Sequence, residues 1–333
     1  MKIFITGATG FIGQHLAKRL VEEGHTVHAI YRSFAKTKSL NYDAIKWFKG
    51  DILSMESLEA AMKDCDQVYH LAAYAVAWEK NKGDFEKYNI QGTINVIESA
   101  INSKIKSMVI TSTAGVFGPS LKNCIDEDTH SLLPHFTGYE KSKAESEKMI
   151  AEYVKKGIRI VIVNPTRVYG PGILNESNTV TKMIISYLKG SWHFIPGNGL
   201  SIGNYAFVTD VVDGHIQAMQ KGRSGERYIL GGENICYVTF FETINKITGE
   251  NHFLFKIPVL LLVGMGYLLE ALNFLFKIKP PFTPAHVKKF NFNWETNTLK
   301  AEKELNYKKT PFTEGIEKTI EWIKSNYQRD KKY

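Results

Sequence analysis

Short apolar segments alternate with segments of helical periodicity through the first half of the sequence. Residues 26–31 are rich in apolar residues, whereas Ile12, Leu16 and Leu20 recur at the spacing of one helix face. We predict strands in the run that begins at residue 2, in 26–31, in the run that ends at 48–52, and in 67–73, 107–113 and 159–163, with helices in 54–63, 84–103 and around 139–143. This alternation predicts a doubly wound parallel α/β sheet.

Three glycines follow the first predicted strand, and a helical pattern begins directly after them. Such a turn places backbone N–H groups and the positive end of a helix dipole where they bind the diphosphate of a dinucleotide. Gly7 would allow the sharp turn, Gly10 would let the diphosphate approach the backbone, and Gly13 would let the helix pack closely on the strand. The spacing therefore predicts a Rossmann-type dinucleotide-binding domain.

Beyond about residue 170 the pattern becomes irregular, with turns rich in glycine and proline. Helices are predicted near 178–189, 208–221, 239–247 and 313–324. We therefore expect residues 1–170 to form the nucleotide-binding domain. Residues 171–333 are expected to form a smaller, mixed α/β lobe for the substrate, from which some strands and helices return to the first domain.

The end of the second predicted strand bears on the choice of cofactor. An acidic residue at this place would bind the ribose 2′-hydroxyl of NAD. Tyr31 holds the place instead, and Arg32 follows it. A guanidinium binds the additional phosphate of NADP bidentately, so we predict NADP, with NAD as the alternative. The other interpretation of Arg32 is a solvated basic loop.

Tyr139 and Lys143 are four residues apart and therefore project from one helix face. Tyrosine is a poor base at neutral pH because its free pKa is about 10, but a nearby lysine cation favours the phenolate. Thr113, at the end of the fifth predicted strand, could hold a substrate oxygen against the tyrosine. Hydride transfer coupled to proton transfer at a carbon–oxygen centre needs this set. Without the nucleotide-binding pattern, such a pair is usually a surface pair.

Apolar residues follow the fourth predicted strand at the carboxyl edge of the sheet, where ligands bind in doubly wound folds. Tyr74, Val76 and Trp78 could line a substrate pocket or fill the joint between the lobes. Phe117 and Tyr205 are further candidate substrate contacts.

Composition narrows the class of partner. With 333 residues, 44% hydrophobic, the chain can bury a large core. The net charge of +8 comes without a nucleic-acid-binding motif, so we expect a surface suited to anionic small molecules and no nucleic acid. The three cysteines lie far apart, which predicts neither disulfides nor a metal site. The first strand begins at residue 2, which leaves no room for a signal peptide, so we expect a cytoplasmic protein.

Residues 258–276 are almost continuously apolar and approach the length of a bilayer span. Glu270 and Asn273 interrupt this segment, and Gly264 and Gly266 weaken it. We expect a buried or partly exposed helix of the second lobe and no integral membrane span. Peripheral membrane contact through 258–276 is the alternative.

Taken together, these motifs resemble the extended short-chain dehydrogenases/reductases, also called the NAD-dependent epimerase/dehydratase family, over nearly the whole chain. The resemblance rests on Thr6–Gly13, Gly50-Asp51, His70–Ala73, Asn89 with Gly92-Thr93, Thr111–Thr113 followed by Val116–Gly118, Tyr139 with Lys143, and Pro165–Gly172. It implies Tyr139 as the acid/base, Thr113 as its hydroxyl partner, and Lys143 as a group that binds the nicotinamide ribose and lowers the tyrosine pKa.

The resemblance also implies the remaining contacts. Asn89 would position the active-site helix or a water, and the helices that carry Asn89 and Tyr139 would form a homodimer interface. The cofactor contacts that we expect are Gly7, Thr9, Gly10, Phe11, Ile12, Gly13, Arg32, Asp51, Ile52, Leu71, Ala72, Ala73, Thr111, Tyr139, Lys143, Pro165 and Val168.

Two branches of that family are possible. Nucleotide-sugar epimerases and dehydratases typically carry an arginine ahead of the Val-x-Asp segment, and here the expected position looks like Gly203. Tyr31-Arg32, the Trp78 loop and residues 225–234 look more like dihydroflavonol reductase-like and hopanoid-associated sugar epimerase-like proteins. That branch implies NADP-dependent reduction of a ketone or aldehyde on a fairly apolar molecule. A nucleotide-sugar enzyme with NAD and a non-catalytic redox-sensing regulator are the alternatives.

Overall fold

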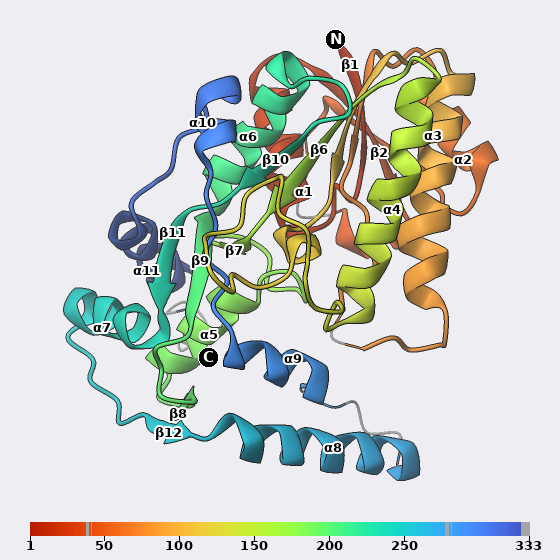
Figure 1. Ribbon diagram of the computed structural model, residues 1–333. Coiled ribbons are helices and arrows are strands. Elements are labelled where there is room, and N and C mark those ends of the chain that lie inside the picture. Colours follow the sequence, from red (N-terminus) through yellow and green to blue (C-terminus); the bar gives the residue numbers. More distant parts are fainter. Residues whose placement is uncertain (38–39, 41, 77, 277–279, 281, 328–333) are drawn as a thin grey trace.

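The computed structural model describes residues 1–333 apart from 38–39, 41, 77, 277–279, 281 and 328–333. Its centre is a seven-stranded sheet in the order β10-β6-β5-β4-β1-β2-β3, with every neighbouring pair parallel (Figure 1). The strands are β1 (Lys2–Thr6), β2 (Thr26–Tyr31), β3 (Ile45–Lys49), β4 (Gln67–His70), β5 (Ser107–Thr111), β6 (Arg159–Pro165) and β10 (Arg227–Leu230). The predicted doubly wound α/β sheet is confirmed.

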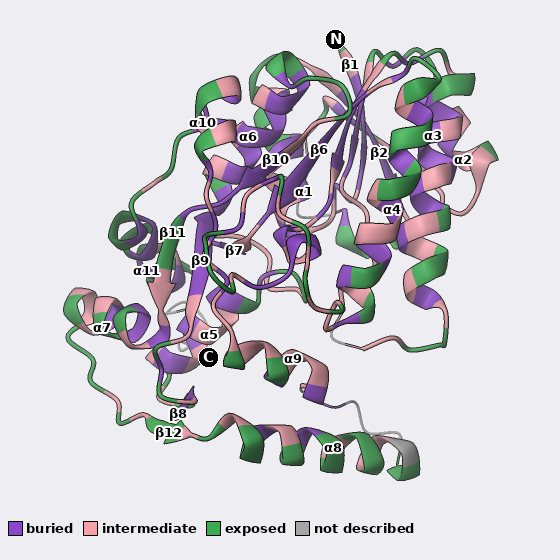
Figure 2. Ribbon diagram, viewed as in Figure 1, coloured by how far each residue is buried: buried purple, intermediate pink, exposed green. Residues whose placement is uncertain are grey.

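Helices cover both faces of this sheet. On one face, α1 (Phe11–Glu22) and α6 (Val208–Lys221) bury side chains in one core cluster with the strands. On the other face, α2 (Met55–Met62), α3 (Gly92–Asn102) and α4 (Gly138–Lys155) enclose a second cluster. Figure 2 shows the strands between them as an almost continuously buried layer. Strands buried on both faces explain why their sequences are apolar runs rather than alternating patterns.

Several strands end earlier than the apolar pattern predicts. β3 ends at Lys49, β4 at His70 and β5 at Thr111. The residues that follow form the loops at the carboxyl edge, including the short helical turn η3 (Ala114–Phe117). The helix predicted over 84–103 is divided into a π-helical turn, η2 (Glu86–Gln91), and α3. Wide π turns of this kind are frequent at functional sites.

The second half of the chain builds a smaller mixed lobe. β7 (Arg167–Tyr169), β9 (Ile202–Phe207) and β11 (Glu233–Cys236) form a three-stranded sheet, and β8 (Phe194–Pro196) pairs with β12 (Phe255–Ile257). An aromatic core joins these strands to α5 (Thr179–Leu188), α7 (Tyr237–Thr248) and α11 (Phe312–Tyr327). The predicted helices of this half are thus present, whereas its short strands were not predicted.

Four further segments complete the chain: α8 (Val259–Phe276), α9 (Pro284–Lys288), η4 (Lys289–Asn291) and α10 (Leu299–Leu305). A short turn, η1 (Phe34–Lys36), follows β2. α6 and β10 come from the second half of the sequence and pack with the large sheet. Across the residues that the structure describes, no helix combines the length and apolar character that crossing a bilayer requires.

Candidate active site

The turn between β1 and α1 leaves no room for a side chain at Gly7 or Gly13. Gly7 has φ +76°, and a Cβ there would lie 2.6 Å from the backbone nitrogen of Ala72. A Cβ on Gly13 would lie 2.1 Å from the carbonyl oxygen of Gly7. Gly10 is the N-cap of α1, and its N–H donates to the Gly7 carbonyl at 2.8 Å. Thr9, Phe11 and Ile12 lie in the same turn, so the backbone at the start of α1 is shaped for a diphosphate.

A buried hydrogen-bond chain fixes the end of β4 beside this turn. His70 lies between the hydroxyls of Thr6 (2.6 Å from Nδ1) and Thr93 (3.0 Å from Nε2). The Thr6 hydroxyl also accepts from the N–H of Ala72, and Thr93 donates to the carbonyl of Asn89. Burial lowers the pKa of His70 to about 3, with Lys143 adding to the effect, so the ring is neutral. His70 is therefore a structural link, not a base.

The residue Asn89, in the π-helical turn, joins the β4 loop to the helix of Tyr139. Its side-chain oxygen accepts from the N–H of Tyr74 at 2.7 Å, and its amide nitrogen donates to the Ser142 hydroxyl at 2.9 Å. Ser142 lies between Tyr139 and Lys143 on α4. Asn89 thus positions the active-site helix, one of the two roles that the resemblance implies.

Tyr139 lies in the first turn of α4, which a reciprocal capping box begins. The Thr137 hydroxyl accepts from the N–H of Glu140, and the Glu140 carboxylate accepts from the N–H of Thr137. Glu140 is 2% exposed, and the ammonium of Lys289 pairs with it. This buried pair fixes the start of the helix next to Tyr139.

The protonation of the Tyr139 pair differs from the expectation. Burial raises the pKa of Tyr139 to about 12, and the neighbouring Glu140 charge adds to the rise. The net shift is therefore upward, opposite to the lowering that the resemblance implied, because desolvation outweighs the other effects on this phenol. Burial also lowers the pKa of Lys143 to about 8, against the raising effect of Glu147. Near neutral pH, the phenol keeps its proton and the lysine is mostly charged.

Thr113 lies beside the same helix. Its side-chain oxygen accepts from the N–H of Gly115 at 3.2 Å, and its carbonyl accepts from the amide of Asn164 at 3.1 Å. The same amide donates to Glu147 at 2.7 Å, one turn beyond Lys143 on α4. Lys143 is 1% exposed, and no hydrogen bond to its ammonium is present among the described residues. A buried ammonium of this kind is ready to bind ligand hydroxyls.

The predicted adenine end lies at the carboxyl edge of β2 and β3. Arg32 is exposed, and its guanidinium carbon lies 5.5 Å from the ring centre of Tyr88. Asp51 accepts from the N–H of Leu53 at 3.0 Å, and Ile52 is 8% exposed. Among the described residues, no carboxylate pairs with Arg32, so its charge is available to a phosphate.

The other predicted cofactor contacts differ in how far they are exposed. Leu71 and Ala72 are partly exposed and Ala73 is exposed at the end of β4, next to Gly7, whereas Pro165 and Val168 are buried. The Thr111 hydroxyl is bonded to His215 of α6 at 2.9 Å. The side chain of Thr111 is therefore used inside the protein, and only its backbone is left for the cofactor.

Two adjoining hollows open between the start of α4, α8 and α9. The smaller, about 300 Å³, is lined by Trp78, Thr137 and Gly138, next to Tyr139. The larger, about 520 Å³, is lined by Phe136, Tyr267 and Lys288 among others. Phe136, Glu270 and Ala285 line both hollows. Trp78 lines the smaller hollow together with Thr137 and Gly138, the two residues before Tyr139, and its contact with a substrate stays a prediction.

Other predicted substrate residues are used for packing. Phe117 is 1% exposed in a core cluster and carries the guanidinium of Arg227 at 4.7 Å from its ring centre. Tyr205 is 2% exposed in the aromatic core of the second lobe. The Tyr74 ring stacks on Tyr88, and Val76 is partly exposed. The assignments of Phe117 and Tyr205 to a substrate pocket are corrected, because their rings are enclosed by protein.

Sequence reasoning missed Arg167, the first residue of β7. One guanidinium nitrogen, Nη1, donates to the hydroxyls of Tyr205 and Tyr237, both at 3.2 Å. Burial alone would lower the pKa of Arg167, but the two phenol oxygens raise it above its ordinary value. A Cβ on Gly203 would lie 2.4 Å from Nη1. The Arg167 guanidinium therefore occupies the space next to Gly203. Gly203 is the position at which nucleotide-sugar epimerases and dehydratases typically carry an arginine.

Arg167 has no carboxylate partner among the described residues. Burial raises the pKa of Tyr205, so its hydroxyl is neutral and does not balance the charge. Burial lowers the pKa of Lys289, and the charge of Arg167 adds to the lowering; the partner of Lys289, Glu140, adjoins Tyr139. Arg167 therefore lies close to the lysine that anchors the Tyr139 helix. A partly buried guanidinium without a counter-charge favours the binding of an anion.

The chain is similar to known proteins over nearly its whole length. Residues 3–231 match the NAD dependent epimerase/dehydratase family. A Synechocystis sp. protein with the provisional name dihydroflavonol 4-reductase is 28% identical over 97% of this chain and 94% of its own. Mus musculus sterol-4-alpha-carboxylate 3-dehydrogenase, decarboxylating, is 28% identical over 96% of this chain and 90% of its own. The structure of UDP-glucuronic acid 4-epimerase from Bacillus cereus, in complex with UDP-glucuronic acid and NAD, matches with a TM-score of 0.78 at 24% identity. The match covers 98% of this chain and 99% of the epimerase chain.

The chain belongs to the NAD dependent epimerase/dehydratase family. It is an enzyme of the short-chain dehydrogenase/reductase class, as the sequence motifs predicted. The family uses NAD or NADP, and the glycine turn, the exposed Arg32 and the buried ammonium of Lys143 fit a dinucleotide of this kind. Among the described side chains, no group of three or more His, Cys, Asp or Glu residues could hold a metal ion.

Proposed function

We propose that this enzyme is an NADP-dependent reductase that converts a ketone or aldehyde of a largely apolar molecule to the alcohol. The observation that carries the proposal is Tyr139, a protonated phenol one helical turn from the buried Lys143. Reduction of a carbonyl needs a proton donor at its oxygen, and a phenol that keeps its proton at neutral pH is suited to that task. The dihydroflavonol reductase and sterol dehydrogenase names among the relatives support this branch.

Each residue has a distinct role in this reaction. Thr113 uses its oxygen to accept from Gly115, which leaves its hydroxyl hydrogen for the substrate oxygen. Tyr139 donates its proton to that oxygen. The charge of Lys143 favours the phenolate that Tyr139 becomes. NADPH, when bound, would supply the hydride and become NADP+. Gly7, Gly10 and Gly13 would hold its diphosphate, and Arg32 its additional phosphate.

The direct test measures oxidation of NADPH with a panel of ketones and aldehydes of graded hydrophobicity. Reduction of apolar ketones, with NADPH preferred over NADH, is the expected result. Turnover confined to sugar nucleotides would contradict the proposed branch.

A nucleotide-sugar epimerase or dehydratase is the second candidate, and one observation favours it. Arg167 on β7 places its guanidinium beside Gly203 on β9, the position at which such enzymes typically carry an arginine. A diphosphate could pair with that charge as well as a carboxylate could. Thermal-shift titration with UDP- and dTDP-sugars separates the candidates, since only the second predicts stabilisation by the sugar nucleotides.

The Arg32→Glu substitution should weaken NADPH binding by roughly 10-fold or more and change NADH binding less. Arg32 is exposed without a carboxylate partner, so its loss removes a charge-assisted contact to the additional phosphate and adds repulsion. Fluorescence titration with both cofactors measures the effect. Lys122→Glu makes the same change of charge at an exposed lysine and serves as the control. Equal losses for NADPH and NADH in Arg32→Glu would contradict the assignment of NADP.

Affinity for the cofactor should decline as the pH rises through about 8, where burial places the pKa of Lys143. Below that pH the ammonium is charged and can donate to ligand hydroxyls. Above it the neutral amine has lost a proton and its charge. Titrations from pH 6.5 to about 9.5 measure the decline, and Lys143→Arg, whose charge does not titrate in this range, should flatten the profile. A wild-type profile that stays flat would contradict this role of Lys143.

We also propose a cytoplasmic homodimer in which α3 and α4 form the interface. These helices lie side by side on one flank of the molecule (Figure 1) and expose Ile101 (39%) and Met149 (42%). Light scattering on Met149→Glu, with a shift to monomer expected, tests the interface.

We also propose that the chain divides near residue 170 into a part that binds the cofactor and a part that binds the substrate.

A further inference from the structure

The helix α8 is apolar around nearly its whole circumference, yet most of it faces outward. Its 18 residues span about 27 Å, and Glu270 is its one charged residue. Large exposed side chains include Leu260 (81%), Leu261 (61%), Met265 (50%), Leu268 (61%), Leu275 (67%) and Phe276 (64%). Figure 2 shows α8 as a mostly exposed rod below the rest of the fold. An exposed apolar surface of this extent marks an interaction site.

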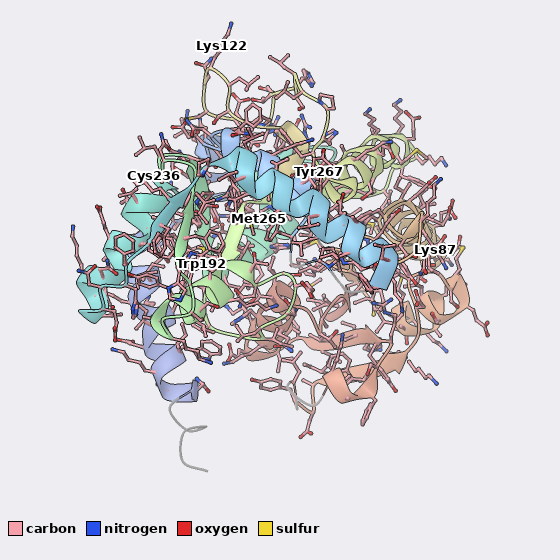
Figure 3. The ribbon with its side chains drawn as sticks, turned by 90° about the horizontal axis from the view of Figure 1, so that it is seen from below. Lys87, Lys122, Trp192, Cys236, Met265 and Tyr267 are labelled. Atoms are coloured by element: carbon pink, nitrogen blue, oxygen red, sulfur yellow. The ribbon has the colours of Figure 1, made fainter. Side chains whose placement is uncertain are left out.

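Within the described chain, α8 packs mainly on α9, along one narrow stripe. Leu262 is 5% exposed, and Gly266 is buried against Pro284. Residues 261, 264, 268, 271 and 275, at intervals of three and four, are exposed on the opposite side. Figure 3 shows α8 lying across the lower face of the molecule with Met265 and Tyr267 on it. The expectation of a buried or partly exposed helix is thus correct only for the stripe against α9.

We propose that α8 is an in-plane membrane-docking helix, whose outward face inserts among the lipids of an anionic bilayer surface. The first reason is the helix itself: it is too exposed for a core helix, and it does not meet the requirements of a bilayer span. Helices that lie in the membrane interface bury an apolar face at the boundary between headgroups and acyl chains.

The second reason is charge. Residues 251–290 contain five lysines and one acid, Glu270, and one of these lysines, Lys289, pairs with Glu140 and is not available to lipid. Lys256 is exposed on β12, just before the helix, and Lys288 is exposed on α9 and donates to the Tyr267 hydroxyl at 3.2 Å. Glu270 lines both hollows on the protein side, so the acid does not oppose the outward face. Lysines beside an apolar face complement anionic lipid headgroups.

The placement of the hollows gives the docking a purpose, a step that rests on the proposed function. Tyr267 and Glu270 of α8 line the hollows that reach Thr137 and Gly138, next to Tyr139. Docking through α8 would therefore bring the opening of the active site to the lipid surface. An apolar substrate dissolved in the bilayer could then enter without crossing water.

The test is sedimentation of the full chain with vesicles of phosphatidylcholine alone or mixed with phosphatidylglycerol. Wild-type protein should pellet with the mixed vesicles, and Leu268→Glu should lower the bound fraction several-fold. Leu299→Glu on α10, at a leucine that is 51% exposed and lies far from α8 in Figure 1, is the matched control and should bind like wild type. Thermal unfolding of both variants checks that they fold.

The outcomes separate the docking from the proposed function, because binding is measured without any substrate. Failure to pellet with either vesicle type overturns the proposal. If Leu268→Glu instead converts a larger assembly into a smaller one by light scattering, without vesicle binding by wild type, the face is an interface between copies of this chain. Equal binding to both vesicle types overturns the preference for anionic lipid.

Discussion

Replacement of Tyr139 by phenylalanine is expected to lower turnover by about 10²–10⁴-fold and to leave NADPH affinity nearly unchanged. The substitution removes the hydroxyl that would donate the proton and keeps the ring. Burial raises the pKa of Tyr139 to about 12, so the wild-type group carries its proton across the working range of pH. Steady-state kinetics and cofactor titration on the same preparation give both quantities.

A matched control for Tyr139→Phe exists on the same helix. Tyr153 of α4 is 7% exposed and donates its hydroxyl to Glu98 at 2.8 Å, on the side of α3. Tyr153→Phe therefore removes one buried phenol hydroxyl far from the cofactor turn and should leave turnover close to wild type. Equal turnover in Tyr139→Phe and wild type would refute the assignment of the proton donor.

The second large effect is expected for Arg167→Met. The guanidinium is partly buried, charged and without a carboxylate partner in the described chain, so an acidic group of the substrate is the partner we expect. Loss of a charge-assisted contact of this kind costs about 1.5–3 kcal/mol, which raises KM roughly 10- to 100-fold. The effect on kcat should be smaller, because Arg167 binds a part of the substrate that does not react.

Pairs of apolar keto acids and their methyl esters measure this effect. Wild-type enzyme should prefer the acid of each pair, and Arg167→Met should lose that preference while it still reduces the ester. Arg167→Lys keeps a charge and should retain part of the preference, since lysine cannot reproduce the planar contact. A wild-type enzyme that reduces acid and ester equally well would show that Arg167 stabilises only the lobe.

The large sheet and the cofactor turn could be predicted because local chemistry specifies them. Apolar runs indicate buried parallel strands, and the three glycines have one geometric explanation, which the 2.1 Å approach of a Gly13 Cβ to Gly7 makes plain. Tyr139 and Lys143 were predictable for the same reason, since their spacing sets one helix face. The raised pKa of Tyr139 could not be predicted, because the burial of its side chain depends on residues far away in the sequence.

Residues brought in by the second lobe could not be foreseen. Arg167 fills the space left by Gly203, and Lys289 pairs with Glu140, contacts that join positions 36 and 149 residues apart. Neither position carries a local motif. Phe117 and Tyr205 show the converse, since aromatic residues near a predicted site were buried by tertiary packing. The exposure of α8 likewise depends on which neighbours the fold provides, and α9 covers only one stripe of it.

The pairing of Lys289 with Glu140 has a consequence for how the enzyme matures. Glu140 is 2% exposed and its carboxylate completes the first turn of the helix that carries Tyr139, yet its cation comes from near the end of the chain. During synthesis, roughly the first 290 residues must leave the ribosome before that carboxylate can be neutralised. A nascent chain that stops before residue 289 holds an uncompensated buried anion beside Tyr139, so a truncation that removes the last 45 residues, Lys289 included, impairs this site as well as the second lobe.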